Sequence, residues 1–265
     1  MFKKSTTIPV INLHGCIGNG NDNISMKNMG SEIEKAFSIK NSPVVVLSIN
    51  SPGGSPTQSA LVGKRIEQLS KENNKKVIAF CEDVAASGGY WLALSAKEIY
   101  AMPTSIIGSI GVISASFGFE KFIEKHSIDR RVFTSGSSKS KLDPFLELKQ
   151  EDKDKISSLQ NTIHEEFINH VKNRRNLKQQ NDVDLFNGDF WCGNEAKQYG
   201  LIDDINDMHT VLKEKYGNVK IKRFSQKRSF LEKLKNGNAV LDSNEFIESF
   251  FSKIKTELEY SKFIS

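Results

Sequence analysis

Apolar residues in the first part of the chain form short runs that alternate with amphipathic segments. Residues 8–13 and 44–49 are almost wholly apolar, and each run is followed within a few positions by glycine. Such runs are typical of strands buried on both faces. Between the two runs, at 29–37, and after the second, at 60–69, apolar residues recur at helical spacing. The pattern predicts the order strand, helix, strand, helix.

The same alternation continues toward the middle of the chain. We expect a third strand at 77–81, a helix of small and aromatic residues at 87–96, and short strands at 98–102, 111–115 and 130–133. Repeated strand–helix units imply a largely parallel sheet. The sequence therefore predicts an α/β fold.

The pattern becomes more polar after residue 150. It predicts a long polar helix at 151–176, a short Phe-Trp segment, and helices at 194–199 and 207–216. We expect one main domain at 1–223 and an amphipathic helical tail at 224–265. Such a tail packs on its own domain or on a partner subunit, or it contacts a membrane surface as a peripheral anchor.

Composition excludes several classes of function. The net charge of +5 comes from 37 basic and 32 acidic residues that are spread along the chain, without a basic stripe interleaved with aromatic residues. A nucleic-acid partner is therefore not expected. No run of about 18 apolar residues occurs, so we expect a cytoplasmic protein, or one peripheral at the inner face of the membrane, without a transmembrane segment or signal peptide.

Metal and disulfide chemistry are not expected either. Cys16, Cys81 and Cys192 are too few and too scattered for a disulfide framework or a zinc site. His164 and His170 are six positions apart, a spacing that does not place two imidazoles on one helix face.

Ser87 is the strongest candidate for chemistry. It lies in the segment Ala-Ala-Ser-Gly-Gly-Tyr at 85–90, at the junction of a predicted strand and a predicted helix. Small neighbours leave room for a substrate carbonyl, and the N–H of Gly88 would be one of the free donors at a helix start. A structural turn or a helix cap is the alternative interpretation.

A second glycine segment, Asn-Ser-Pro-Gly-Gly at 50–54, follows the strand 44–49 directly. Glycine there can turn an N–H toward a neighbouring strand end and supply a second oxyanion donor. A plain tight turn is the alternative.

A serine nucleophile needs a base, and no histidine has a context that marks it as one. A lysine can serve if burial lowers its pKa toward neutrality. The small-residue loop at 134–145 contains Lys139 and Lys141, and spacing alone leaves both open beside the interpretation as a solvated loop.

Several motifs in this order resemble the signal peptide peptidase A family, the SppA/SohB-like S49 serine peptidases. They are Asn50-Ser51-Pro52-Gly53-Gly54, Ala85-Ala86-Ser87-Gly88-Gly89-Tyr90, Gly108-Ser109-Ile110-Gly111-Val112, Ser135-Gly136 with Lys139 and Pro144-Phe145, and the closing segments Phe186-Asn187-Gly188, Glu195-Ala196 and Tyr199-Gly200-Leu201-Ile202-Asp203. The resemblance spans roughly residues 8–215. It implies a Clp-protease and crotonase type of fold, a spiral of β-β-α units, here with a C-terminal helical extension.

The resemblance also implies the roles of the site residues. The family's base lies 52 residues after its serine, which matches Lys139 and not Lys141. Ser109 matches the hydroxyl that orients this lysine, and Gly54 and Gly88 match the residues whose amides form the oxyanion hole. No cofactor and no metal are implied.

The chain departs from the family pattern in three respects. We expect no N-terminal membrane anchor of the kind that members commonly have, and one copy of a domain that some members contain twice. The chain also has Asn50 where many members have Asp. We expect the exchange at Asn50 to be tolerated, because the backbone and not the side chain is the oxyanion donor.

The expected function is that of a serine endopeptidase that hydrolyses peptide bonds with a Ser87–Lys139 dyad. By resemblance, its substrates are signal-peptide remnants or misfolded polypeptides, and it is a homo-oligomer in which Lys139 acts on Ser87 of its own or of a neighbouring chain. Two alternatives remain at this point: a crotonase-type acyl-CoA enzyme, and a non-catalytic scaffold of the same fold.

Overall fold

The computed structural model describes residues 6–136, 138–178 and 183–226. The chain divides into two compact units. The first, called the sheet unit here, contains the described residues of 1–111 and 166–226, and the second unit contains those of 112–165.

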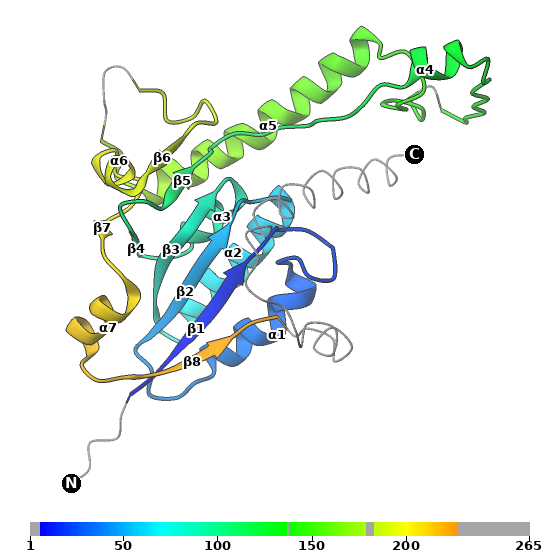
Figure 1. Cartoon of the computed structure of the whole chain (residues 1–265). Helices are drawn as coiled ribbons and strands as arrows, with labels where there is room; N and C mark the ends of the chain where they lie inside the picture. Colours follow the sequence, from blue (N-terminus) through cyan, green and yellow to red (C-terminus); the bar gives the residue numbers. More distant parts are fainter. Residues whose placement is uncertain (1–5, 137, 179–182, 227–265) are drawn as a thin grey trace, which may run out of the picture. The chain divides into compact units, whose positions relative to one another are not determined.

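The sheet unit follows the strand–helix order predicted from the sequence, and its elements are seen in Figure 1. They are β1 (Thr7–His14), α1 (Met26–Phe37), β2 (Val44–Ser51), α2 (Pro56–Glu72), β3 (Lys76–Ala86), α3 (Gly88–Ala93), β4 (Glu98–Ala101), β5 (Ile106–Gly108), the end of α5 (Gln150–Arg174), β6 (Phe190–Cys192), α6 (Gly193–Gln198), β7 (Asp204–Ile205), α7 (Met208–Tyr216) and β8 (Lys220–Phe224).

Local capping fixes where the first two helices begin. The side chain of Ser25 accepts a hydrogen bond from the N–H of Asn28 at the start of α1, and the side chain of Ser55 does the same for Gln58 in α2. Pro56 occupies the first turn of α2, where its missing N–H costs no helical hydrogen bond. The chain segment just after Gly54 is therefore committed to helix.

The strands form one largely parallel sheet in the order β6-β5-β3-β2-β1-β8, as the strand–helix pattern predicts. Only β5 and β6 pair antiparallel. The long strand β3 pairs with β4 through Ile78–Cys81 and with β5 through Val84–Ala86. Its two halves thus belong to different strand pairs, in agreement with the Clp-protease and crotonase type of fold expected from the resemblance.

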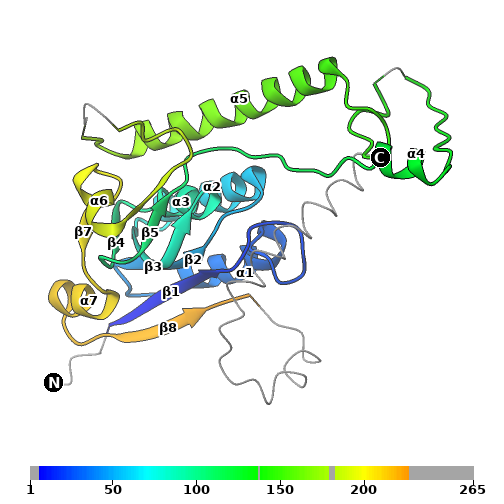
Figure 2. The same cartoon turned by 45° about the horizontal axis from the view of Figure 1, so that its top comes forward.

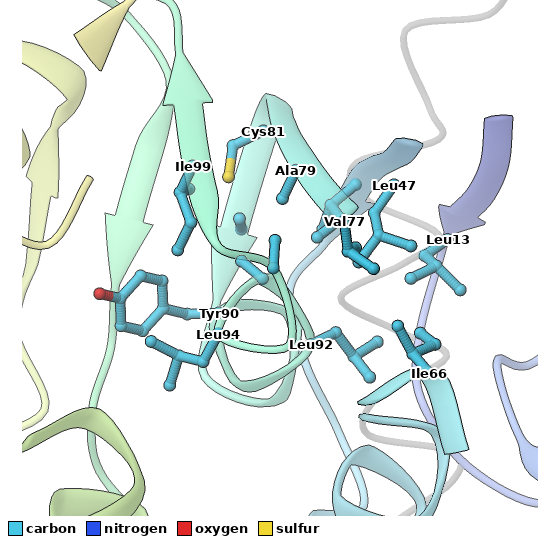
Figure 3. Packing of buried hydrophobic residues seen from close by; sticks show 14 of the residues in the cluster. Leu13, Leu47, Ile66, Val77, Ala79, Cys81, Tyr90, Leu92, Leu94 and Ile99 are labelled. Atoms are coloured by element: carbon cyan, nitrogen blue, oxygen red, sulfur yellow. The ribbon is translucent and has the colours of Figure 1, made fainter. Parts of the chain in front are cut away.

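Apolar side chains pack on both faces of the sheet. The larger cluster lies between the sheet and helices α1, α2 and α3, with Leu47, Ile66, Val77, Leu92 and Tyr90 among its buried members (Figure 3). On the other face, α7 covers the first halves of the strands with a smaller cluster. On that face, the second halves of the strands carry polar residues. The sequence pattern had predicted that β1 and β2 are buried on both faces along their whole length, so it did not indicate this polar region.

The edge strand β8 was not predicted. It pairs parallel with β1 from Lys220 to Phe224, and Figure 2 shows the two strands side by side. Phe224 is its buried residue, Ile221 is partly buried against the smaller cluster, and the other three positions are exposed. The strand ends one residue past the expected domain boundary, and the predicted amphipathic tail lies, from residue 227 on, outside the described residues.

The second unit contains α4 (Glu120–Lys125) and the larger part of α5. The long helix predicted at 151–176 is confirmed by α5, whereas the strands predicted at 111–115 and 130–133 are wrong. An extended segment is a strand only when another strand supplies its hydrogen-bond partners. Neither segment pairs with one in the described part of the chain.

Candidate active site

Ser87 stands alone between the last residue of β3 and the first residue of α3. Its backbone has φ 52° and ψ −123°, a conformation that a residue with a side chain rarely adopts. The N–H donates to the carbonyl oxygen of Gly108 (2.8 Å), and its own carbonyl accepts from Trp91 (3.0 Å). The hydroxyl does not cap the helix, and the residue is half-buried, so the oxygen is available for another role.

The glycine segment after β2 is pressed against Ser87. Gly53 has φ +102°, and a Cβ atom on it would lie 2.7 Å from both the Cβ of Ser87 and the backbone nitrogen of Gly88. Gly54 has φ +140°, and a Cβ there would lie 2.1 Å from the carbonyl oxygen of Ile17. No side chain fits at either position, so this loop requires both glycines.

The amides of Gly54 and Gly88 are the two donors expected from the resemblance. Ile17 donates to the carbonyl of Gly53 (2.9 Å) and accepts from Ser55 (2.9 Å), so these bonds leave the N–H of Gly54 turned away from Ile17. Gly54 is exposed. Gly88 is the first residue of α3, where an N–H has no intrahelical acceptor. The nitrogen of Gly54 lies 3.4 Å from where a Cβ on Gly88 would be.

Ser109 is tied to the same place through its neighbour. Gly108 accepts the hydrogen bond from the N–H of Ser87, and Ser109 follows it with φ 50°. The N–H of Ser109 donates to the carbonyl oxygen of Asp189 (2.7 Å) just before β6. The backbone of Ser109 is thereby held beside the Ser87 turn, and its side chain is half-buried.

Buried groups behind Ser87 hold α3 in place. The hydroxyl of Tyr90 is buried and donates to the carbonyl oxygen of Leu201 (2.7 Å), and burial raises the pKa of this phenol. A Cβ on Gly89 would lie 2.4 Å from the carbonyl oxygen of Ser51, so α3 approaches the end of β2 at backbone distance. Burial also raises the pKa of the Cys81 thiol to about 12, which makes it a poor nucleophile.

Charged side chains lie near the strand ends that carry the glycine loop. His14 Nε2 lies 3.4 Å from a carboxylate oxygen of Glu82 and 3.2 Å from the hydroxyl of Ser48, and Ser48 donates to Glu82. The hydrogen bond from His14 is the largest cause that lowers the pKa of Glu82, and the hydrogen bond from Ser48 adds to it, while partial burial opposes it. Glu82 is therefore an anion near neutral pH.

Lys139 belongs to the second unit. It is exposed, its N–H donates to the carbonyl of Gly136 (3.2 Å), and its ammonium makes no ion pair or side-chain hydrogen bond with any described residue. Lys141, by contrast, lies 3.4 Å from the buried carboxylate of Asp152. The structure thus distinguishes two lysines that spacing alone left equivalent: Lys141 is engaged in its own unit, and Lys139 is not.

The structure brings Ser87, Gly54, Gly88 and Ser109 together at one end of the sheet, while Lys139 lies in the other unit. The contact of Gly53 with Ser87 was not predicted from the sequence, although the glycine pair at 53–54 could have indicated a close approach of the backbone. Sequence reasoning also missed Asp189, whose carbonyl holds Ser109. That contact comes from a segment 80 positions away and has no local signature.

The described residues contain neither a membrane-spanning helix nor a metal-binding cluster. None of their helices combines the length and apolar character needed to cross a bilayer. No three histidine, cysteine or acidic side chains in the described ranges gather closely enough to hold a metal ion.

Comparisons with known proteins agree with these motifs. A protein from Brucella abortus named Na(+)/H(+) antiporter NhaA is 48% identical over 85% of this chain, which spans 31% of that protein. A putative signal peptide peptidase SppA from Enterococcus faecium is 29% identical over 68% of this chain, which spans 52% of it. The chain therefore corresponds to about a third to a half of these relatives.

A solved structure, a mutant of the 1510-N membrane-bound stomatin-specific protease, is 17% identical, with 85% of this chain and 100% of that chain covered and a TM-score of 0.45. The family match is to Peptidase family S49 over residues 69–222, a range that includes Ser87, Ser109 and Lys139. This match covers more than half of the sequence, and the chain belongs to peptidase family S49.

Proposed function

We propose that this protein is a serine endopeptidase in which Ser87 is the nucleophile and Lys139 the general base. The observation that carries the proposal is the strained turn at Ser87, held against the Gly53-Gly54 loop with two amides near its side chain. Strain of this kind costs about 1–3 kcal/mol and persists where the surrounding structure enforces it. Membership in peptidase family S49 supports the same assignment.

The proposed reaction proceeds through an acyl-enzyme. The neutral amine of Lys139 accepts the proton of the Ser87 hydroxyl as the oxygen attacks a peptide carbonyl carbon. The N–H groups of Gly54 and Gly88 donate to the oxyanion. The C–N bond then breaks, and the ammonium of Lys139 returns the proton to the departing amine. Water, deprotonated by Lys139, attacks the ester carbon, and Ser87 leaves with the proton to complete the cycle.

Lys139 is preferred to Lys141 as the base because of what each contacts. A base must be free to lose its proton and to reach the serine hydroxyl within about 2.6–3.2 Å. Lys141 lies 3.4 Å from the carboxylate of Asp152 and is engaged in that ion pair. Lys139 has no such partner in the described part of the chain, and Ser109 is the hydroxyl proposed to orient it.

Extended polypeptides are the proposed substrates, namely signal-peptide remnants or misfolded chains. We propose that an extended peptide lies beside Ser87 and pairs with backbone groups at the strand ends there. The name of the Enterococcus faecium relative, putative signal peptide peptidase, is consistent with remnants of signal peptides. For this chain we propose a cytoplasmic location or a peripheral one at the inner face of the membrane, which fractionation of cells would test.

A homo-oligomer is proposed from the surface of the second unit. Ten of its large apolar side chains are exposed, a high number for 54 residues, and α4 has no buried residue. They are Ile113, Phe117, Phe119, Phe122, Ile128, Val132, Phe133, Phe145, Leu148 and Leu159. Exposed apolar surface on this scale marks an interaction site. We propose that further copies of this chain cover it.

Labelling with a fluorophosphonate probe tests the nucleophile. The wild-type protein should be labelled at Ser87 and should hydrolyse casein or an unstructured peptide, and Ser87→Ala should abolish both signals. Ser38→Ala, on the surface after α1, is the matched control and should change neither. Turnover of an acyl-CoA without labelling of Ser87 would instead favour a crotonase-type enzyme. Hydrolysis that survives in both Ser87→Ala and Lys139→Ala would come from a contaminating peptidase. That result would favour the alternative that this protein is a non-catalytic scaffold of the same fold.

Mixing two inactive variants tests which chain supplies the base. Ser87→Ala and Lys139→Ala are each expected to be inactive. If Lys139 acts on Ser87 of a neighbouring chain, a refolded mixture regains activity because some sites receive both groups. If the dyad lies within one chain, the mixture stays inactive. The native mass, measured on the same samples, tests the oligomer, and a monomeric wild type would contradict it.

A further inference from the structure

Asn50 makes hydrogen bonds to both neighbouring strands at the point where β2 ends. Its backbone carbonyl accepts from the N–H of Gly15 just after β1 (2.9 Å). Its side-chain oxygen accepts from the N–H of Val84 (3.2 Å), and its side-chain nitrogen donates to a carboxylate oxygen of Asp83 (2.9 Å), both in β3. Asn50 is half-buried; its bond with Val84 is partly shielded from water, and its bond with Asp83 is exposed.

These contacts lie where the pairing of β2 with β3 becomes irregular. Ile49 pairs with Cys81, and the next pair along is Ser51 with Ala85. Asn50 therefore stands opposite three residues of β3, at 82–84, where a regular ladder would place one. Its side chain provides the acceptor for Val84 that the interrupted ladder does not.

This irregularity decides how the two site segments meet. β3 leads directly to Ser87, and β2 leads directly to Gly53 and Gly54. The register between the strands sets which backbone atoms lie side by side after they end, and the fit of Gly53 against Ser87 leaves no room for even one additional carbon atom. A shift of the bulge would move the nucleophile relative to the proposed oxyanion donors.

We propose that Asn50 is a positioning residue of the active site, whose side-chain amide holds the bulge of β3 and so sets the spacing between Ser87 and Gly54. This inference rests on the proposed peptidase function. The amide is suited to the role because it combines a donor nitrogen with an acceptor oxygen, and each makes one of these bonds. An aspartate could accept from Val84, but its second oxygen would face the carboxylate of Asp83 without a proton between them.

The charged residues around position 50 increase the expected effect of replacing Asn50 with aspartate. His14 of β1 lies opposite Asn50 in the sheet register, and β3 contributes Glu82 and Asp83. Glu82 is paired with His14, and Arg223 of β8 acts on Glu82 through space. A carboxylate at position 50 would therefore have Asp83 as its direct partner, with the nearest histidine already engaged. The tolerance expected from the sequence for aspartate at this position thus depends on residue 83.

Three variants test the inference: Asn50→Asp, Asp83→Asn, and the two combined. Asn50→Asp should lower kcat about tenfold near neutral pH with little change in KM, because an unmet hydrogen bond and a like-charge pair displace Ser87. Asp83→Asn should stay near wild type, because an asparagine oxygen still accepts from Asn50.

The double variant is the decisive measurement. It restores one donor and one acceptor with their positions exchanged, so it should recover most of the activity and a wild-type pH profile. A double variant as impaired as Asn50→Asp, or an Asn50→Asp variant as active as wild type at every pH, would overturn the proposal. If Asn50→Asp alone does not fold, the double variant still decides: it should be folded and active, and an inactive folded protein counts against Asn50.

Amide hydrogen exchange separates this inference from the proposed function. Exchange at Val84 should be faster in Asn50→Asp than in wild type and should slow again in the double variant. That result does not depend on peptidase activity. A wild-type protein that neither hydrolyses peptides nor reacts with the probe would disprove the proposed function alone. Unchanged exchange at Val84 in Asn50→Asp would instead disprove the proposal that Asn50 holds the bulge of β3.

Discussion

Gly53 touches Ser87 so closely that a Cβ atom on the glycine would lie 2.7 Å from the Cβ of the serine. The two residues come from different strands, and each leaves its strand with a positive φ angle. Their contact links the loop after β2 to the turn after β3. Because of this contact, we expect position 53 to tolerate substitution as poorly as the proposed catalytic residues do.

We predict that Gly53→Ala lowers kcat/KM for peptide hydrolysis about a hundredfold, because the methyl group separates Ser87 from the loop that supplies the amide of Gly54. The rate of fluorophosphonate labelling should fall in parallel. Gly217→Ala is the matched control: its φ is +74°, with no atom within 4 Å of an added Cβ, so it carries backbone strain without a clash. Equal activity in the two variants would contradict the prediction.

The assignment of the base predicts different outcomes for the two neighbouring lysines. Lys139→Ala should lose about 10²- to 10⁴-fold in kcat, the range for a general base. Lys141→Ala should keep most of its activity per folded molecule, although the loss of the partner of Asp152 should lower its stability. Steady-state kinetics together with thermal unfolding measure both. The assignment fails if Lys141→Ala is the inactive variant.

The activity of the wild type should also depend on pH in a definite direction. Only an unprotonated amine accepts a proton from Ser87, so kcat/KM should rise with pH over the range in which the base deprotonates. A rate that stays constant from about pH 5 to about pH 9 would argue against a lysine base. The profile is best measured in one mixed buffer at constant ionic strength.

Tyr90→Phe should destabilise the protein by about 1–3 kcal/mol, because it leaves the carbonyl of Leu201 without its buried donor. Activity per folded molecule should change little, since the phenol lies behind Ser87. Tyr216→Phe is the control, as the Tyr216 hydroxyl makes no hydrogen bond in the described part of the chain, and its effect should stay within about 0.5 kcal/mol. Urea unfolding measures both, and equal effects would contradict the role of the Leu201 contact.

Because of the environment of His170 in α5, we expect the protein to lose stability in mild acid. Its ring stacks on Trp91 with centroids 4.8 Å apart, and its Nε2 is buried without a partner among the described residues. Burial, helped by Arg174 and opposed by Glu67, holds the pKa of His170 below its usual value of 6.5. The unfolded chain therefore binds the proton first, so the stabilisation is complete above about pH 6.5 and is lost as pH falls below it.

Replacing His170 with Phe keeps an aromatic ring on Trp91 and removes the titrating group. Between about pH 7 and pH 5 the free energy of unfolding should fall less in His170→Phe than in wild type. Chemical denaturation at both pH values provides the comparison. If the two proteins lose the same stability on acidification, His170 is not the group responsible.

Local patterns of the sequence were sufficient for much of the fold. The apolar runs at 8–13 and 44–49 predicted β1 and β2 at nearly their observed bounds, and the small and aromatic residues at 87–96 predicted α3. The third strand, predicted at 77–81, extends further, to Ala86. Local patterns were sufficient because burial and helix periodicity act over a few residues. The ordered motifs likewise placed the chain in its family, which the match over 69–222 confirms.

Other features depended on partners distant in the sequence. The segments 111–115 and 130–133 have strand-like residues but no strand to pair with among those described, and β8 exists because β1 offers it an edge. The resemblance already favoured Lys139 over Lys141, and the structure adds that Lys141 lies beside Asp152, which is distant in the sequence.

The candidate site shows the same division. The sequence by itself determined that glycine pairs follow β2 and Ser87. Positive φ angles select glycine at Gly53 and Gly54, whereas Gly88 and Gly89 have no room for a Cβ atom. Only the tertiary structure decided how the two strands align, because a bulge held by Asn50 against residues 34 positions away leaves no periodic trace. The close packing of Gly53 on Ser87 is the consequence of that alignment.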